Sequence, residues 1–456
     1  MKSLKFYIAL WGAKFSIVLL KLLRRNASSF PGKFALTIDS NFMEKISKPK
    51  TIIGVTGTNG KTTVCNMIED VLRENNYDFI DNKYGSNINN GITTTLIYGV
   101  SIFNKSKKDL AVLEIDERSA PKVFPYLKPT YLVCTNLFRD SLMRNAHTEF
   151  IADILTNNMH KDTKLIVNAD DLISSNIAPN NERVLFSINR LESDTLECNN
   201  IVRDIRVCPK CNTKLEYEYV RYHHIGKAKC PNCDFKNFEA EFLVETIDID
   251  NKNMLVKNND KKEKYYLPNT NIINIYNVLA VITLLKQIGL SAQKINNGLK
   301  KLKIVETRFS EELYEGINIV THLAKGMNPI ACSRAFHYAK NTTGSKIAIV
   351  LVDDLHEDHK GTENIAWQYD TDYEFLNDES IKQVIIAGPR YLDSYVRMLL
   401  AGVPKEKIVY IKDEIEATSK ANLEGINKVV ILHDLYSIEE TNNIKNKIKS
   451  MIEEIK

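Results

Sequence analysis

The stretch TIIGVTGTNGKTTVCNMIEDVL, residues 51–72, decides the fold that we expect for this chain. Residues 51–55 have the composition of a buried strand, and after a polar turn apolar residues recur at helical spacing, at Val64, Met67, Ile68, Val71 and Leu72. A strand, a glycine turn and a helix N-terminus form a cradle for phosphate groups, because backbone N–H groups converge there and the helix adds a partial positive charge. The sequence therefore predicts an anion site at this turn.

The residue types in the turn predict that this anion is ATP. Lys61 is expected to lie against the β- and γ-phosphates, and the hydroxyl of Thr62 is expected to hold Mg²⁺. Val55 stands where the general Walker pattern has its first glycine, so the turn is the shorter GTNGKT form. We expect the nucleotide to be bound by Gly57, Thr58, Asn59, Gly60, Lys61, Thr62 and Thr63.

The composition is that of an ordinary soluble protein. The chain has 456 residues, enough for two or three domains, with 44% hydrophobic and 26% charged residues. A net charge of +4 is small for this length, so it does not favour a nucleic-acid partner. Eight cysteines, four of them in two close pairs, and the lack of a cleavage site after the first apolar run predict a cytoplasmic protein with a metal site.

The first apolar segment, residues 4–23, allows three interpretations. It is interrupted by Lys5, Lys14 and Lys21, and Lys14 at the centre of a transmembrane helix would cost about 3 kcal/mol. A helix packed on the protein's own body is favoured over an interfacial membrane helix, and both are favoured over a span. Peripheral contact with the inner face of a membrane through residues 4–23 stays among the expectations.

An acidic side chain at the end of the next buried strand is a candidate metal ligand. The strand in DLAVLEIDE covers residues 110–115, and Glu114 leaves it beside the expected nucleotide site, with Asp116 behind it. A carboxylate at this place is where a second contact to Mg²⁺ is expected. The alternative is an ordinary acidic turn former.

Two further buried strands end in polar residues, in YLVCTN (residues 131–136) and KLIVNADD (residues 164–171). Strands that alternate with helices at this rhythm predict an α/β protein with a mostly parallel sheet and its site at the carboxyl ends of the strands. Arg139 and Asp140, just beyond the first of these strands, are expected to face that site.

Two cysteine pairs then interrupt the sheet pattern, Cys208 with Cys211 in CPKC and Cys230 with Cys233 in CPNC, with 18 residues between the pairs. Each turn aims two thiolates at one point, so together they supply four tetrahedral sulfur ligands and predict a structural Zn²⁺ in a zinc ribbon inserted at residues 203–240. The aromatic and basic residues between the pairs are expected to pack the ribbon rather than to bind nucleic acid.

The remaining chain predicts a hairpin, a long helix and a second α/β unit. The hairpin falls within residues 251–267 and the helix within 271–290, where Asn277 either caps the preceding loop or contacts a ligand such as adenine. From residue 305, five buried strands alternate with helices in a Rossmann-like pattern that lacks GxGxxG. The polar block at residues 353–364 is too long for a plain turn, and such loops usually carry function.

Seven motifs occur in the order found in one known family. They are GTNGKTT, LEIDE, TNLFRD, NADD, the paired CPxC turns, NIINIYNVLA, and TRF followed by THLAK. The chain thus resembles the Mur ligases, and more narrowly their MurT type, the ligase subunit of lipid II isoglutaminyl synthase. The resemblance implies an N-terminal helical segment (residues 1–48), a Mur-ligase central ATP-binding domain (49–304) and a C-terminal Rossmann-like ligase domain (305–456).

The resemblance also implies ATP-dependent amide synthesis through an acyl phosphate. In the MurT type the activated group is the α-carboxyl of D-glutamate in lipid II, and the amine is ammonia from a glutaminase subunit. Asp353 and Asp358 are the candidates to complete that subunit's catalytic triad. The residues that the resemblance assigns to ATP and Mg²⁺ are Lys61, Thr62, Glu114, Asn277 and Arg308.

The four cysteines that are not in the CPxC pairs agree with an amine supplied by another protein. None of Cys65, Cys134, Cys198 and Cys332 has the flanking glycines of a glutaminase nucleophile elbow. The chain departs from the family pattern after Asp140 and within the polar block, on the acceptor and partner side, so the amine donor or the acceptor can differ. Two alternatives are a Mur-type ligase that adds an amino acid or peptide to a peptidoglycan or pseudomurein precursor, and a non-catalytic ATP-binding zinc scaffold.

Overall fold

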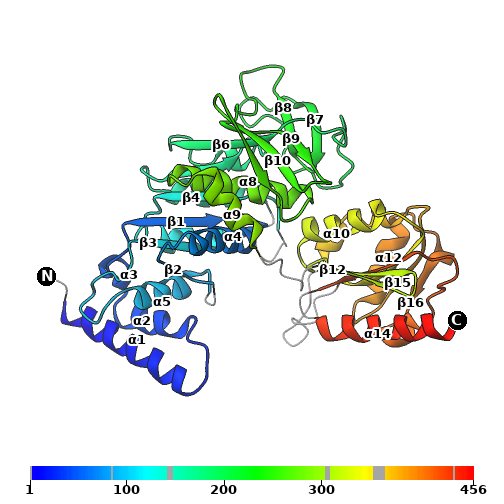
Figure 1. Cartoon of the computed structure of the whole chain (residues 1–456), viewed down its shortest axis with the longest axis horizontal. Helices are drawn as coiled ribbons and strands as arrows, with labels where there is room; N and C mark the ends of the chain where they lie inside the picture. The colour runs from blue at the N-terminus through cyan, green and yellow to red at the C-terminus, as the bar shows by residue number, and fades with distance from the viewer. Residues whose placement is uncertain are drawn as a thin grey trace. The chain divides into compact units, whose positions relative to one another are not determined.

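The computed structural model describes residues 3–83, 86–140, 147–302, 309–352, 365–434 and 437–455. The chain forms two compact units (Figure 1). The first comprises Met1–Phe138, Thr148–Glu197 and Ile205–Lys303, and the second comprises Ile304–Lys456 with the short segments Arg139–His147 and Cys198–Asp204. Each unit is built around its own sheet.

A nine-stranded sheet, in the order β11-β10-β9-β6-β5-β4-β1-β3-β2, forms the centre of the first unit. All its pairings are parallel except β9 with β10 and β10 with β11, so the expected mostly parallel sheet is confirmed and the expected hairpin forms its edge. Its strands are β1 Thr51–Thr56, β2 Phe79–Asp81, β3 Leu110–Glu114, β4 Tyr131–Cys134, β5 Lys164–Asn168, β6 Arg183–Ile188, β9 Phe242–Asp248, β10 Asn253–Asn258 and β11 Lys261–Tyr266.

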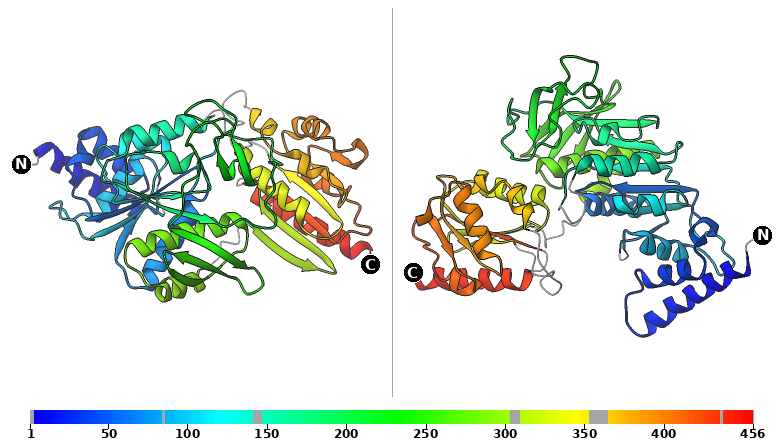
Figure 2. Two further views of the ribbon diagram at one scale, coloured as in Figure 1. Left: turned by 90° about the horizontal axis from the view of Figure 1, so that it is seen from above. Right: turned by 180° about the vertical axis from the view of Figure 1, so that it is seen from behind.

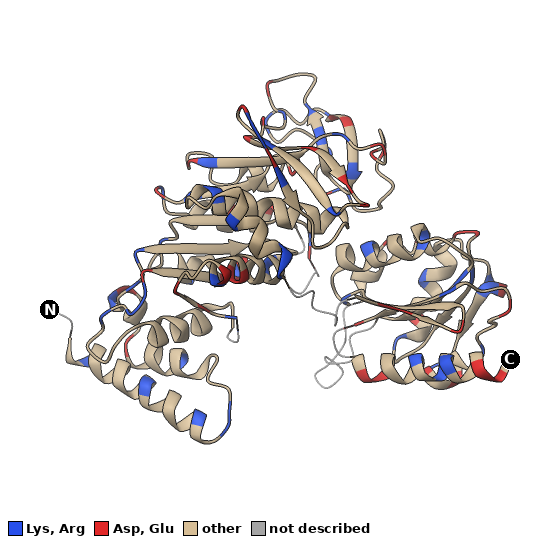
Figure 3. Ribbon diagram, in the orientation of Figure 1, with Lys and Arg blue, Asp and Glu red and all other residues tan. Residues whose placement is uncertain are grey.

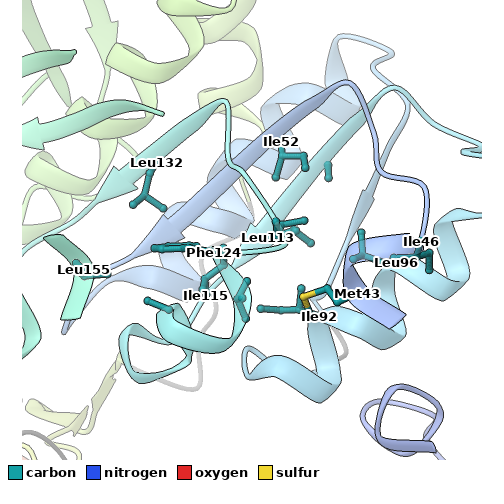
Figure 4. Close-up of a cluster of buried hydrophobic side chains, with 14 of the residues drawn as sticks. Met43, Ile46, Ile52, Ile92, Leu96, Leu113, Ile115, Phe124, Leu132 and Leu155 are labelled. Atoms are coloured by element: carbon teal, nitrogen blue, oxygen red, sulfur yellow. The ribbon is translucent and has the colours of Figure 1, made fainter. Parts of the chain in front are cut away.

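Helices cover this sheet, which explains why its central strands are apolar on both faces. One face packs against α4 (Lys61–Glu74), α8 (Ile272–Gln287) and α9 (Ala292–Lys300). On the other face Ile52, Leu113 and Leu132 point into a cluster shared with Ile92 and Leu96 (Figure 4). The helices of that second face are α5 (Asn89–Gly99), α6 (Ala120–Val123) and α7 (Thr148–Asn158), and the N-terminal helices pack against α5.

The N-terminal helices are α1 (Leu4–Leu22), α2 (Phe30–Ile38) and α3 (Phe42–Lys45). One side of α1 is buried in the cluster just described, and Phe6 stacks on Phe42 with 5.0 Å between the ring centres. This packing agrees with the interpretation of residues 4–23 as a helix held on the protein's own body. Among the described helices, none has both the length and the apolar character needed to cross a membrane.

The cysteine-bearing insert forms a separate antiparallel pair of strands, β7 (Glu216–Tyr222) and β8 (Ile225–Lys229). Its small core holds Leu215, Ala228 and Phe235 beside the cysteines. The pair is fastened to the main sheet by Arg221, whose guanidinium lies 3.2 Å from Asp170 and 2.7 Å from Asp194.

The second unit is an α/β domain with a six-stranded sheet in the order β12-β13-β17-β14-β15-β16. The five strands expected from sequence are present and mutually parallel, and the antiparallel edge strand β12 was not foreseen. The strands are β12 Phe309–Tyr314, β13 Ile317–Leu323, β14 Lys346–Leu351, β15 Ile381–Ile386, β16 Ile408–Tyr410 and β17 Lys428–His433.

Helices lie on both faces of this second sheet, as Figure 2 shows. Successive side chains of each central strand point alternately into two hydrophobic cores, one on each face of the sheet. The sequences of these strands are therefore continuous apolar runs. One core takes α10 (Pro329–Asn341), α11 (Ala366–Tyr369) and α12 (Tyr391–Leu400), and the other takes α13 (Glu414–Thr418) and α14 (Ile438–Ile455).

Candidate active site

The glycine turn between β1 and α4 has a backbone that only glycine adopts readily. Gly57 and Gly60 have φ of 124° and 89°, in the region that disfavours a side chain. Neither position has room for a side chain. A Cβ on Gly57 would lie 2.2 Å from Oγ1 of Thr135, and one on Gly60 would lie 2.7 Å from Oδ1 of Asn277. The turn therefore packs tightly against β4 and α8 while α4 begins at Lys61.

Polar residues after β4 hold the turn in place. The backbone N–H of Thr58 donates to the carbonyl of Asn136 at 2.9 Å, and the N–H of Asn59 donates to Oδ1 of the same residue at 3.0 Å. In return, the Asn136 amide and the Thr135 hydroxyl donate to the carbonyl of Asn59, at 2.9 and 2.6 Å. Because β1 and β4 are adjacent, these contacts fix the turn at the carboxyl end of the sheet.

Lys61 is held by a carboxylate that the sequence analysis did not single out. Its ammonium lies 2.9 Å from Oε1 of Glu117 and 2.5 Å from the carbonyl of Gly57. The same Glu117 oxygen accepts the N–H of Gly57 at 2.9 Å. Burial, the largest single influence, would lower the pKa of Lys61, but the charge and hydrogen bond of Glu117, together with the charges of Asp116 and Glu114, outweigh burial and raise that pKa, so the ammonium stays charged.

Glu114 and Thr62 lie at the same edge of the sheet as the turn. Glu114 is the last residue of β3 and pairs in register with Val55, just before the turn, and its Oε1 accepts the Asn87 amide at 2.9 Å. Thr62 has an exposed side chain in the first turn of α4. The carboxylate and the hydroxyl are oxygen ligands of the kind that Mg²⁺ prefers, so this donor set fits the expected metal.

Asn277 is buried on α8 with its amide against Gly60, so it faces the turn. The N-terminus of α8 is capped by Asn271, whose side chain accepts the N–H of Ile273. Arg308, Asp353 and Asp358 lie outside the described residues.

Arg139, which was expected to face the site, has its guanidinium bound to carboxylates of the second unit. Its Nε lies 2.6 Å from Oδ1 of Asp204, and its Nη1 lies 3.2 Å from Oδ1 of Asp370. Asp370 follows α11, and Asp204 ends the short segment that belongs with the second unit. In this structure the positive charge of Arg139 is therefore neutralised there.

The four paired cysteines converge on one point. The Sγ atoms are separated by 3.5 Å between Cys208 and Cys233, and by 3.4 Å between Cys211 and Cys230. All four sulfurs lie within 4.8 Å of one another. Four thiolates about 2.3 Å from a tetrahedral Zn²⁺ would be about 3.8 Å apart, so the cluster has close to the size such an ion needs.

A buried carboxylate–histidine pair behind the site was also missed from sequence. Oδ1 of Asp171, just after β5, lies 3.1 Å from Nε2 of His224, and its Oδ2 accepts the N–H of Leu137 at 3.1 Å. Burial, the largest single influence, would raise the pKa of Asp171, but the interactions with His224 and the hydrogen bonds from Ser174 together outweigh burial and lower that pKa. In the sequence, Asp171 stands out only as a polar residue of the NADD run. His224, in the turn between β7 and β8, is 53 residues away, so no local pattern joins the two residues.

Comparison with known proteins places this geometry in a family. A model of the Mur ligase middle domain matches residues 55–233, and a model of the MurT ligase C-terminal region matches residues 323–437. The "Lipid II isoglutaminyl synthase (glutamine-hydrolyzing) subunit MurT" of Staphylococcus aureus (strain COL) is 30% identical over 402 residues, which cover 87% of this chain and 88% of that protein. The chain belongs to the Mur ligase family, to its MurT group.

A second MurT subunit and several solved structures extend the comparison. The MurT subunit of Streptococcus pneumoniae (strain ATCC BAA-255 / R6) is 28% identical over 432 residues, 94% of this chain and 92% of that protein. A pseudomurein peptide ligase type C from Methanothermus fervidus has a TM-score of 0.65 at 20% identity, covering 91% of this chain and 81% of that one. MurF from Acinetobacter baumannii has a TM-score of 0.63 at 12% identity, covering 92% and 80%. At these identities the two structures establish the Mur ligase fold alone.

Membership of this family makes the chain an ATP-dependent carbon–nitrogen ligase. The matched middle domain includes the turn, Glu114, Glu117 and the cysteine cluster. The reaction class therefore follows from the family, and the structure adds where the side chains of the turn and its neighbours lie.

Proposed function

We propose that this MurT-type ligase amidates a carboxyl group of a cell-wall precursor peptide, with ammonia delivered by a separate glutaminase subunit. The similarity to two MurT subunits over most of the chain carries this proposal, since both are named as parts of a glutamine-hydrolysing lipid II isoglutaminyl synthase. The acceptor would then be the α-carboxyl of D-glutamate in lipid II.

The turn supplies the groups that such a reaction needs at the triphosphate. Lys61 and the backbone N–H groups at the start of α4 would contact the phosphates, and Asn277, which faces Gly60, would lie toward the nucleotide. Mg²⁺ held by Thr62 and Glu114 would neutralise charge where two anions meet. Because the turn is already fixed to β4, little reorganisation is needed when the substrate arrives.

The chemistry divides into two displacements. A carboxylate oxygen attacks the γ-phosphorus of ATP, the bond to the bridging oxygen breaks, and ADP leaves with that oxygen. Ammonia then attacks the acyl carbon and inorganic phosphate leaves, so the product is an amide and one proton is released. The protein contributes by bringing the reactants together and by placing the Lys61 charge against the transferred group.

The cysteines of the chain support an external source of ammonia. Cys65, Cys134, Cys198 and Cys332 are all buried. Burial raises the pKa of the Cys65, Cys134 and Cys198 thiols, and the Cys332 thiol donates to the carbonyl of Ala324. A glutaminase needs an accessible thiolate nucleophile, which these side chains do not offer. The remaining four cysteines would bind a structural Zn²⁺ with no open coordination position.

Release of phosphate from ATP tests the proposal directly. The purified chain is mixed with ATP, Mg²⁺ and detergent-solubilised lipid II, and then with ammonium chloride, with glutamine plus a candidate glutaminase subunit, or with single amino acids. We expect phosphate release with ammonium, and mass spectrometry should show that the product has gained an amide. Lys61→Ala should abolish turnover, and Lys50→Ala, at an exposed lysine just before β1, should not.

The other outcome identifies the second candidate. Stimulation by an amino acid, with no response to ammonium or to glutamine plus the glutaminase, would replace amidation by the addition of an amino acid to a peptidoglycan or pseudomurein precursor. Turnover that depends on Lys61 in either case keeps the ligase assignment. The scaffold alternative predicts no turnover under any of these conditions.

A further inference from the structure

The outward face of α1 is an unusual surface for a protein in water. Its buried side is formed by Phe6, Leu10, Ala13 and their neighbours, yet large apolar side chains also line the opposite side. They follow one another at spacings of three and four residues, which places them on one face of the helix. We call this the apolar face, and it comprises Leu4, Ile8, Trp11, Phe15, Val18 and Leu22.

These side chains are strongly exposed, since Phe15 retains 68% and Leu22 retains 76% of its full accessible area. The loop after α5 adds exposed Ile102 and Phe103, and the indole N–H of Trp11 donates to the carbonyl of Ile102 at 2.9 Å. Single exposed apolar residues are ordinary, but a contiguous row marks a binding surface.

The charge in the middle of the helix is turned away from this face. The Lys14 ammonium donates to the carbonyls of Ile97 and Val100 at the carboxyl end of α5, at 2.8 and 2.7 Å. Burial there lowers the pKa of Lys14 to about 8. Lys14, whose charge argued in the sequence against a membrane span, is thus engaged within the protein and does not interrupt the apolar face.

Basic residues surround the apolar face and acidic residues are absent from this part of the sequence. Residues 1–38 contain seven of the 61 Lys and Arg residues of the chain and none of its 57 Asp and Glu residues. Lys21, Arg24 and Arg25, at the end of α1, are exposed. In Figure 3, α1 accordingly shows blue and tan but no red.

We propose that α1 lies flat on an anionic lipid bilayer, with the apolar face among the acyl-chain boundary and the flanking basic residues against lipid phosphates. An amphipathic arrangement of this kind, with Trp and Phe on one side and Lys and Arg around it, suits the interface of a membrane. A second copy of the chain fits less well, because residues 1–38 of that copy contain no Asp or Glu and so offer no negative charge to these basic residues. The proposal stands on the surface alone and is independent of the acceptor of the ligase.

Sedimentation with vesicles, without nucleotide or lipid II, tests this surface. The full chain is mixed with phosphatidylcholine vesicles or with vesicles that contain one-quarter phosphatidylglycerol. We expect binding to the anionic vesicles that weakens with salt. Phe15→Ser combined with Leu22→Ser should reduce the partition coefficient at least about tenfold. Leu313→Ser, at an apolar residue of β12 that is 69% exposed, should leave the partition coefficient unchanged.

A charge variant separates lipid phosphate from a purely apolar attraction. Replacing Arg24 and Arg25 by serine should lower binding by about fivefold for each arginine at low salt. All variants should retain the thermal unfolding midpoint of the wild type, since these side chains are exposed. The proposal is overturned if the wild type does not bind anionic vesicles, or if the Phe15/Leu22 variant binds as well as the wild type. It is also overturned if vesicles fail to bind while sedimentation velocity shows a dimer that Phe15→Ser dissociates.

Discussion

Oε1 of Glu117 accepts hydrogen bonds from two donors at once, the ammonium of Lys61 and the N–H of Gly57, each at 2.9 Å. Both donors belong to the turn that we propose binds the triphosphate. We therefore expect the buried carboxylate to compete with phosphate oxygens for these two donors. Burial raises the pKa of Glu117, and the Lys61 ammonium opposes that rise.

We expect Glu117→Gln to destabilise the free protein and to tighten its binding of Mg²⁺-free ADP. Removal of one charge of a buried pair leaves Lys61 without its counter-ion, at a cost of about 3 kcal/mol in the free energy of unfolding. The same change removes repulsion between a carboxylate and the phosphates, and a gain of about 1 kcal/mol would lower the Kd about fivefold. Thermal unfolding and isothermal titration calorimetry measure the two effects.

Glu114→Gln is the matched variant, because it neutralises a carboxylate at the same edge of the sheet without touching Lys61. It should leave Mg²⁺-free ADP binding as it is and weaken binding in the presence of Mg²⁺ by about tenfold. Weaker binding of Mg²⁺-free ADP by the Glu117 variant would show that this carboxylate supports the nucleotide instead of competing with it.

The close approach of Gly60 to Asn277 leads to a second prediction. Gly60→Ala places a methyl group 2.7 Å from Oδ1 of Asn277 and strains a backbone with φ of 89°. Nucleotide affinity should fall at least about tenfold, because the turn and the start of α4 must shift together. Gly289→Ala, with φ of 90° but no atom within 4 Å of the added Cβ, has similar backbone strain without the clash. It should cost about 1 kcal/mol of stability and leave nucleotide affinity unchanged.

The parts of the site that depend on consecutive residues could be predicted from the sequence. The strand–turn–helix of residues 51–72 and the position of Glu114 at a strand end follow from consecutive residues, so both were placed correctly at the edge of the sheet. Glu117 was missed because LEIDE contains three carboxylates, and the sequence does not tell which of them contacts the glycine turn. The 3₁₀ turn Glu117–Ser119 places the last of the three against the N–H of Gly57.

Other features required knowledge of distant pairings. The turn is held by Thr135 and Asn136, which reach it because β4 lies next to β1. The order of strands in a sheet cannot be predicted from local sequence, so this role was not foreseen. The antiparallel β12 alternates without a strong apolar pattern and becomes a strand through its pairing with β13. The side on which Lys14 points was equally beyond the sequence, since α1 carries apolar residues all round.

The four converging sulfurs predict a third result. The purified chain should contain one zinc ion, measured by mass spectrometry of the digested protein, and Cys230→Ser should lose it and lower the unfolding temperature. Cys332→Ser should keep the zinc, because that buried thiol lies outside the cluster and donates to the carbonyls of Ala324 and Lys325. Lys61→Ala should also keep it, since the two sites use separate residues. Full zinc content in the Cys230 variant would contradict the four-sulfur site.

His322 in β13 gives the second unit a dependence of stability on pH. Its ring packs on Tyr338 and Phe309, with centroid distances of 5.2 and 5.6 Å, and Nδ1 has no hydrogen-bond partner. Burial, with a smaller contribution from the nearby Arg334, lowers its pKa from 6.5 to about 4. The unfolded chain therefore binds a proton more readily than the folded one, so stability is complete above pH 6.5 and falls as the pH drops toward 4.

His322→Phe keeps an aromatic ring in this position and removes the titrating group. At pH 4 the variant should regain up to about 3 kcal/mol relative to the wild type, because each unit of pKa difference corresponds to about 1.4 kcal/mol. Denaturant unfolding at several pH values, followed by a signal from the second unit, measures this difference. The gap in stability between the two proteins should stay constant above pH 6.5 and change below it. A constant gap across the whole range would mean that His322 is protonated as easily in the folded protein as in the unfolded chain.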